Sequence, residues 1–421
     1  MDCYINVCKP TEGEPSDAIG VFGAALEDTI MRKGWPAKAG SKILDAFVSP
    51  FDATVVARLL DHGIGIVGRA RMNEFGLPPL VSREAGDRCD VAGATDAADA
   101  VDAVDAGAAD AVDAVDAAGA ADAVGAVVAD AVGAVAAGAA SFALCNDIFG
   151  IYRRRAAEAG LCYLHPTYGT VSRYGLIPLA CSMDQIGIVC KQPADGFHIL
   201  SVVAGNDPKD GAMFPETKYA YAKTGKTIRV GVPAAVVNRA DEGTRASIRR
   251  FVSEHASTDI ELKFFDIHKQ VMYILACAEA SSNLMRYDGV KFGHRSAQYR
   301  DLNELYVNTR TEALGVEAKL ASIMGFMVLS QGNYGMYYEK AMKLRRLIKE
   351  SLRFDEYDVI ALPATLGGGP YEDLSLYALA PLAGLPSVSF SFEGHGMQLV
   401  AGVKNENALL TALAHFGEDR R

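Results

Sequence analysis

The chain has 421 residues, of which 50% are apolar and 22% are charged, a profile typical of a globular α/β protein with a large core. Its net charge is −11, but nine Asp lie between Asp96 and Asp130 with no Lys or Arg among them, which leaves −2 for the rest. No basic run is dense enough to predict direct binding to DNA or tRNA.

The cysteines and the N-terminus predict a cytoplasmic protein. The eight Cys form no C-x-x-C pair and are expected to stay reduced. The first residues show no basic region followed by an apolar run, so we expect no signal peptide. The uncharged stretch 131–144 is too short and too weakly apolar to cross a bilayer, so we expect no membrane segment.

The first predicted elements follow an irregular lead-in over residues 1–40. Apolar residues at positions 55, 56, 59 and 60 fall at helical spacing, and Gly63 ends this helix. The next residues, IGIVG at 64–68, predict a buried strand. Together they indicate a β/α arrangement.

Residues 92–140 form an Asp/Ala/Val/Gly low-complexity repeat. ADAVDAVDA occurs at 98–106 and at 109–117, and ADAVGAV occurs at 121–127 and at 129–135. Ala favours helix, but unpaired Asp one turn apart destabilise it. One interpretation is slippage in a repetitive gene segment, giving a frayed helix or a disordered arm. The other is an acidic docking arm or a cation-binding surface.

The remaining elements alternate between helix and strand. We expect helices over 243–256, 267–286, 303–330, 334–352 and 405–416, and strands over 227–233, 358–365, 385–392 and 396–402. Strands far apart in sequence and joined by helices predict an α/β fold in which a mixed central sheet is covered by helices on both faces. We predict one domain over 1–421, with the repeat inserted in it.

The motifs for metals and phosphates are absent from the sequence. There is no H-E-x-x-H, no Cys/His cluster and no G-x-x-x-x-G-K-[ST], so no metal or cofactor is predicted. The Gly-rich residues 366–370 are interpreted as a turn after a strand rather than a phosphate loop. The triplet 153–155 (RRR) is interpreted as a solvated charge run rather than an anion site.

Several longer segments resemble the amidase-signature family. CYLHPTYGTVSRYGLIPLACSMDQIGIV (162–189) resembles its core, and AEASSNLMRYDGVKFGHRS (278–296) resembles the subfamily of glutamyl-tRNA(Gln) amidotransferase A subunits. GSKIL (40–44), RMNEF (71–75) and LAGLPSVS (382–389) extend the match in the same order. The resemblance implies the amidase-signature fold over nearly the whole chain, except the repeat and a shortened N-terminus.

The resemblance also implies an activity and partners. In the family, a Ser attacks the amide of glutamine, a second Ser with a cis peptide relays the proton, and a Lys acts as base. The ammonia serves an ATP-dependent tRNA amidotransferase whose B subunit uses ATP and Mg²⁺. We therefore expect possible partners in the B and C subunits, with tRNA reached only through them.

All three catalytic positions of the family are changed in this chain. ALEDTIMRKG places Glu27 at the position of the Lys, and DIFGIYR places Ile151 at the position of the nucleophilic Ser. Counting back from AVAAG (134–138) places the cis-Ser position at Val127, and no Ser occurs between Ser82 and Ser141. No catalytic residue is therefore expected to be intact.

The substrate-binding positions are changed as well. The oxyanion loop corresponds to Ile148, Phe149 and Gly150, where Phe149 replaces a Gly. The family Arg that pairs with the substrate carboxylate falls near Leu320 and Ala321. Several residues that include the family's amine-binding Asp are missing before LAGLP.

Polar residues of the scaffold are retained in two segments. They are Tyr168, Ser172, Arg173, Tyr174, Asp184 and Gln185 in the first, and Glu279, Ser281, Asn283, Arg286, Tyr287 and Asp288 in the second. One interpretation is that they are hydrogen-bonded structural groups. The other is that they are a remnant of a surface facing the partner subunits.

Three hypotheses follow for the function. The first is a catalytically impaired homologue of the amidotransferase's glutaminase component, either a pseudoenzyme or a degenerate gene copy. The second is a working glutaminase whose catalytic residues lie in the repeat region, at positions that the alignment above assigns wrongly. The third is a non-catalytic scaffold or regulator that binds the B and C subunits.

Overall fold

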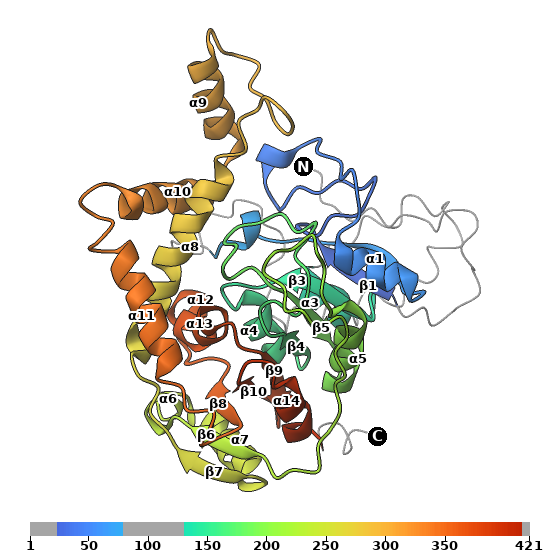
Figure 1. Ribbon diagram of the computed structural model, residues 1–421, viewed down its shortest axis with the longest axis vertical. Helices are drawn as coiled ribbons and strands as arrows, with labels where there is room; N and C mark the ends of the chain where they lie inside the picture. Colours follow the sequence, from blue (N-terminus) through green and yellow to red (C-terminus); the bar gives the residue numbers. More distant parts are fainter. Residues whose placement is uncertain (1–22, 79–129, 415–421) are drawn as a thin grey trace, which may run out of the picture.

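The computed structural model describes residues 23–78 and 130–414, which build one ten-stranded sheet (Figure 1). The strand order is β2-β1-β3-β5-β4-β9-β10-β8-β6-β7. The strands are β1 (Gly23–Glu27), β2 (Gly65–Ala70), β3 (Phe142–Asn146), β4 (Cys162–His165), β5 (Ile186–Cys190), β6 (Arg229–Val232), β7 (Ala256–Asp259), β8 (Val359–Pro363), β9 (Ser387–Phe392) and β10 (His395–Ala401). Pairs at both ends of the sheet are parallel and the central pairs are antiparallel, so the predicted mixed sheet is confirmed.

Helices cover both faces of the sheet, as the sequence predicts. Alternate residues of β8 separate the two faces: Val359 and Ala361 belong to one apolar cluster, whereas Ile360 and Leu362 belong to another. The first face carries α1 (Thr54–Asp61), α5 (Pro193–Val203), α7 (Glu242–Ser253) and α14 (Glu406–Ala412). The second carries α3 (Ala131–Ala136), α4 (Ile151–Glu158), α8 (His268–Leu284) and α13 (Leu374–Ala383).

Outside α8 lie further helices. They are α9 (Leu302–Ala313), α10 (Val316–Leu329) and α11 (Tyr338–Glu350), and α9 stands away from the sheet (Figure 1). Two short helices, α6 (Ala234–Val237) and α12 (Gly369–Glu372), complete the set of α-helices in the described ranges. Among these residues, no helix is long and apolar enough to span a membrane.

The prediction of a single helix over 303–330 is wrong, because the helix is interrupted between α9 and α10. Both carboxylate oxygens of Glu74 accept the backbone N–H of Gly315, each at 2.9 Å. Gly315 is the N-cap of α10, where a carboxylate satisfies a free N–H and complements the helix dipole. Glu74 is distant in sequence, and the local sign of this break is Gly315 itself, a residue unfavourable inside a helix.

The end of the low-complexity repeat belongs to the folded core. Asp130 caps α3 by accepting the N–H of Gly133 at 2.9 Å, and Ala131, Val132 and Val135 of this helix are buried. The inserted segment therefore ends before residue 140. Residues 92–129 lie outside the described residues, and the single-domain assignment stays a prediction.

Candidate functional site

The candidate site lies where β1 and its parallel neighbour β3 end. Glu27 is the last residue of β1 and is fully buried. Its Oε2 accepts hydrogen bonds from the Thr29 hydroxyl at 2.6 Å and from the backbone N–H of Asn146 at 2.9 Å. The residue predicted at the position of the family Lys is therefore a carboxyl group that is hydrogen-bonded to the end of β3.

The loop from β3 to α4 is held by a buried arginine. Arg153 has no exposed surface and forms an ion pair with Asp147, with Nε 3.2 Å from Oδ2. The same guanidinium donates to the carbonyls of Asp147 and Ile148 and, at 3.0 Å, to that of Tyr377 in α13. The interpretation of 153–155 as a solvated run is therefore wrong for Arg153, which ties the loop to α13.

The segment predicted to match the oxyanion loop, residues 148–150, has buried apolar side chains. Ile148 and Phe149 are 4% and 2% exposed, and the Phe149 ring packs on that of Tyr273 with centroids 5.3 Å apart. Gly150 has φ +81°, and a Cβ there would overlap the Tyr377 ring. The loop therefore packs as part of the apolar core.

The residue predicted at the nucleophile position begins the next helix. Ile151 is the first residue of α4, and its half-buried side chain packs against the apolar cluster that contains Phe149. Val127, the predicted position of the cis-Ser, lies outside the described residues. Glu27 is thus connected to Ile151 by its hydrogen bond from Asn146 and by the loop over residues 147–150.

Burial governs the chemistry of the titratable groups here. Burial raises the pKa of Glu27 to about 8, although hydrogen bonds from Thr29 and Asn146 oppose this shift. Burial also raises the pKa of Tyr152 well above its ordinary value. Near neutral pH both groups are therefore mainly protonated, so neither is a ready base or nucleophile.

A second acidic group is linked to the site through Asn146. Asp184 accepts from the side-chain amide of Asn146 at 2.9 Å and from the N–H of Leu179 at 3.1 Å. Burial raises the pKa of Asp184 to about 6, although these hydrogen bonds act to lower it. Asp184 therefore acts as an anchor between β3 and the 179–185 segment.

The two residues predicted near the position of the family's substrate-binding Arg carry no polar side chain. Ala321 is fully buried against α8, whereas Leu320 is 37% exposed on the other side of α10. Neither residue offers a hydrogen-bond donor to a carboxylate.

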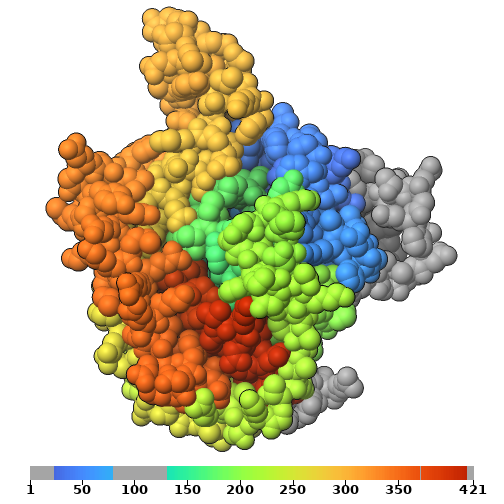
Figure 2. All heavy atoms as spheres, viewed as in Figure 1, coloured from blue at the N-terminus to red at the C-terminus, as the bar shows by residue number. Residues whose placement is uncertain are grey.

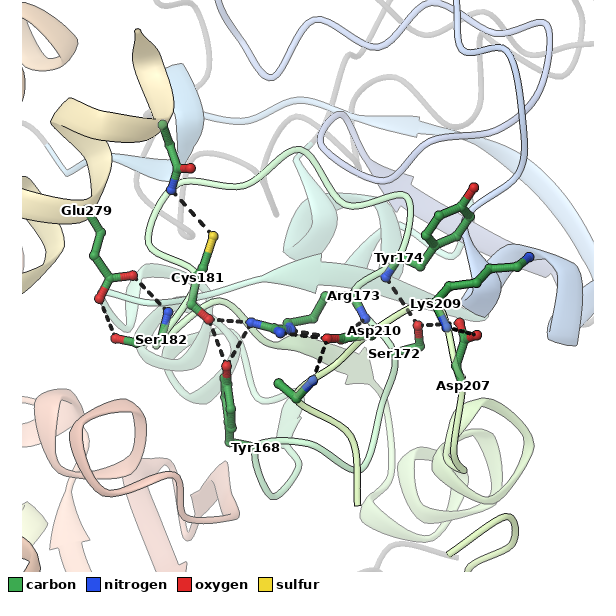
Figure 3. A network of polar contacts seen from close by, with 12 residues as sticks. Tyr168, Ser172, Arg173, Tyr174, Cys181, Ser182, Asp207, Lys209, Asp210 and Glu279 are labelled. Atoms are coloured by element: carbon green, nitrogen blue, oxygen red, sulfur yellow. Dashed lines mark hydrogen bonds and ion pairs between the residues drawn. The ribbon is translucent and has the colours of Figure 1, made fainter. Parts of the chain in front are cut away.

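The retained polar residues form an internal network (Figure 3). Arg173 forms an ion pair with Asp210, with Nη2 2.7 Å from Oδ1, and donates to the Tyr168 hydroxyl at 2.8 Å. Ser172 donates to Asp207 at 2.7 Å. Asp207 and Asp210 were not identified from sequence, although their string GNDPKDG has the composition of a polar turn.

The second retained segment is joined to the first. The carboxylate of Glu279 accepts the backbone N–H of Ser182 at 2.8 Å, and Asn283 donates to the carbonyl of Leu179 at 3.0 Å. Arg345 of α11 donates to the Ser182 hydroxyl at 2.8 Å. These contacts favour the structural interpretation of the retained residues, because their partners lie within the chain.

Comparisons with known proteins agree with this architecture. The family model described as amidase matches residues 21–84 and 132–371. The glutamyl-tRNA(Gln) amidotransferase A subunit of Lachnoclostridium phytofermentans is 34% identical over 87% of this chain and 74% of its own length. The protein of the same name from Neisseria gonorrhoeae is 34% identical over 95% of this chain and 84% of its own.

Solved structures show the same fold. The crystal structure of the glutamyl-tRNA(Gln) amidotransferase A subunit from Thermotoga maritima has a TM-score of 0.66 at 23% identity, over 93% of this chain and 82% of that one. The structure of 6-aminohexanoate cyclic dimer hydrolase has a TM-score of 0.68 at 16% identity, over 94% and 84%. From the matched family model and these relatives, the chain belongs to the amidase family and is a homologue of the glutamyl-tRNA(Gln) amidotransferase A subunits.

Proposed function

We propose that this chain is a catalytically impaired homologue of the glutaminase component of the amidotransferase, either a pseudoenzyme or the product of a degenerate gene copy. The observation that carries the proposal is Ile151 at the position of the nucleophile, where the side chain has no lone pair to attack a carboxamide. The rest of the site supports the same conclusion.

The base position supports the proposal through its charge. Glu27 replaces a Lys, and its buried carboxyl remains mainly protonated up to a pH of about 8. Loss of nucleophile and base together reduces the rate of a Ser hydrolase on the order of 10⁶-fold. We therefore expect no measurable release of ammonia from glutamine.

The shape of the loop over residues 148–150 also supports the proposal of lost catalysis. Phe149 is buried in the apolar cluster next to Gly150, so its side chain takes the space beside the oxyanion donors. Donors contribute to acyl transfer only when they point at an accessible oxyanion. Restoring a hydroxyl alone would leave this obstruction in place.

A second candidate function is a scaffold or regulator that binds the B and C subunits. It is favoured by the intact internal network around Arg173 and Glu279, which preserves the shape of the segments most similar to the family's glutaminase component. Such a protein needs no cofactor itself, since ATP and Mg²⁺ would be used by the B subunit, and tRNA would be met only through the complex. The alternative of a working glutaminase requires a nucleophile elsewhere in the chain.

The experiment compares the purified chain with Ile151→Ser and with the double variant Ile151→Ser, Glu27→Lys. Circular dichroism checks that each variant folds. We expect no ammonia from glutamine and no covalent adduct with the unaltered chain. A glutamyl adduct on the unaltered chain, detected by mass spectrometry, would overturn the proposal.

The regulator alternative has its own measurement. A competitor should co-purify with the B subunit, and it should lower the transamidation rate of an intact complex. Failure to co-purify would reject that role and leave the loss of catalysis unaffected.

A further inference from the structure

A row of polar side chains crosses the buried centre of the sheet, which the surface view in Figure 2 leaves out of sight. His165 of β4 lies opposite Ser387 of β9, and Ser389 of β9 lies opposite Gln398 of β10. All four residues are 0% exposed. They are referred to below as the buried polar row.

The four side chains of the row point to the same face of the sheet. Their strand neighbours Leu164, Val388 and Leu399 belong to the apolar cluster on the first face. Because successive side chains of a strand alternate between the two faces, the row lies on the second face, which α4 and α13 cover.

Most polar atoms of the row have no hydrogen-bond partner among the described residues. They are both ring nitrogens of His165, the hydroxyl oxygens of Ser387 and Ser389, and Oε1 of Gln398. The amide nitrogen of Gln398 is bonded, since it donates to the Leu376 carbonyl at 3.0 Å. More than about 90% of buried polar groups in proteins are paired, so five unpaired atoms at neighbouring positions indicate a bound ligand.

The helix above the row does not satisfy these atoms. α4 packs on β4, β9 and β10, and Ala156 and Ala157 among its buried residues offer no polar side-chain group. Arg153 of the same helix donates instead to Asp147 and to the Tyr377 carbonyl. The row therefore needs partners that the described part of the chain does not supply.

His165 has the most demanding requirement. Burial lowers the pKa of its imidazole well below the ordinary value, and the nearby Arg153 cation adds to this shift. The neutral ring has one N–H donor and one acceptor nitrogen, so it needs two different partners. A direct bond with Ser387 would satisfy one ring nitrogen and leave the other unpaired.

Water has the hydrogen-bonding groups that the row lacks. One water molecule can donate to an imidazole nitrogen or an amide oxygen and can also accept from an N–H or a hydroxyl. Internal water molecules make about three hydrogen bonds each to buried polar groups, so about two of them would satisfy five atoms. An ion is disfavoured, because the row carries no formal charge to balance it.

We propose that the buried polar row binds internal water, about two molecules, which bridge β4, β9 and β10. The water would connect His165 with the serine hydroxyls and with Oε1 of Gln398. The proposal does not depend on the loss of glutamine chemistry, because the row contains none of the predicted catalytic positions.

A high-resolution crystal structure of the full chain tests the site without any substitution. We expect ordered water about 2.7–3.2 Å from a ring nitrogen of His165 and from a hydroxyl of Ser387 or Ser389. Direct bonds between Ser387 and His165 and between Ser389 and Gln398, with no such water, would overturn the proposal. A ligand other than water in this place would also overturn it.

Relaxation dispersion of water oxygen counts long-lived internal water molecules in solution. The double variant Ser387→Ala, Ser389→Ala should lose about one such molecule or more. Ser281→Ala is the matched control, because the buried Ser281 hydroxyl donates to the Ala278 carbonyl at 2.8 Å, and it should lose none. Circular dichroism checks that each variant folds, and an unchanged count in the folded double variant would contradict the proposal.

Stability of the same double variant separates hydrated hydroxyls from unpaired ones. If water satisfies both hydroxyls, their removal should raise the equilibrium constant for unfolding by about tenfold. Removal of two hydroxyls that have no partner should lower this constant, which would overturn the proposal. A higher constant without loss of internal water would mean that the hydroxyls bond directly within the chain, and this result would overturn it as well.

Discussion

At the scale of single residues, Glu27 shows how burial changes what a substitution means. The family resemblance predicts an exchange of Lys for Glu at this position, which suggests a reversed charge. The structure places this carboxyl in the core, where burial raises its pKa to about 8. The predicted exchange would therefore replace a cation by a mainly neutral acid at physiological pH.

This pKa makes stability dependent on pH. The unfolded Glu27 ionises near 4.5 and the folded one near 8, so its contribution to the free energy of unfolding falls as pH rises between these values, by up to about 1.4 kcal/mol per pH unit. Glu27→Gln should flatten the curve of stability against pH from about 5 to about 8, measured by urea unfolding. The exposed Glu339→Gln serves as control, and parallel curves for Glu27→Gln and the unaltered chain would contradict the expectation.

Gly150 provides a second test at this scale. It has φ +81°, and an added Cβ would overlap the Tyr377 ring, so Gly150→Ala should lower the free energy of unfolding by about 3 kcal/mol or more. Gly160 has φ +71° and open space around it, so Gly160→Ala should lower it by only about 1 kcal/mol. Equal effects in chemical denaturation would mean that contact with Tyr377 is unimportant.

At the scale of elements, Arg153 joins α4 to α13. Its side chain neutralises Asp147 and donates to three carbonyls, one of them in α13. The sequence shows only three consecutive arginines, and nothing in that run distinguishes the buried one. Asp147 and Ile148 are near in sequence, but the Tyr377 carbonyl in α13 is 224 residues away, and residue pattern alone does not reveal this contact.

Removing this side chain should affect both elements. Arg153→Leu leaves a buried carboxylate without its counter-charge, so we expect a loss of about 3–5 kcal/mol in the free energy of unfolding. Arg346→Leu, which breaks an exposed i,i+4 pair with Glu350, should change it by less than about 1 kcal/mol. Similar losses from both substitutions in urea unfolding would contradict the role of Arg153.

Strand and helix positions were mostly predictable because their apolar periodicity is local. The strands expected at 358–365, 385–392 and 396–402 correspond to β8, β9 and β10. β7 was missed, since all of its residues are exposed and none of its positions shows a buried pattern. The break at Gly315 was missed because it depends on the distant Glu74.

At the scale of the whole molecule, one continuous sheet connects the N-terminal and C-terminal parts of the described chain. The family resemblance predicted this arrangement, and the same alignment predicts the loss of the catalytic side chains, which stays a prediction. Local sequence could not predict how the vacated site is packed, since Phe149, Tyr273 and Tyr377 meet there from separate segments.

Continuity of the sheet predicts a shared unfolding transition. Trp35 is the only Trp, and it reports on the N-terminal part, where the Arg32 guanidinium lies 4.4 Å from its ring centroid. Leu399→Ala in β10 should lower the free energy of unfolding by about 2–5 kcal/mol and shift Trp35 fluorescence and far-ultraviolet circular dichroism together. If only the unfolding transition seen by circular dichroism shifted, and not the one seen by Trp35 fluorescence, β10 and the N-terminal part would belong to separate domains.

The exposed apolar side chains of α10 have a consequence for the abundance of this protein in a cell. Val316, Leu320, Ile323, Phe326 and Met327 are open to water, as are the apolar side chains by which chaperones and proteases recognise incompletely folded proteins. The steady-state level of the protein would then be set by its rate of degradation as well as by its rate of synthesis.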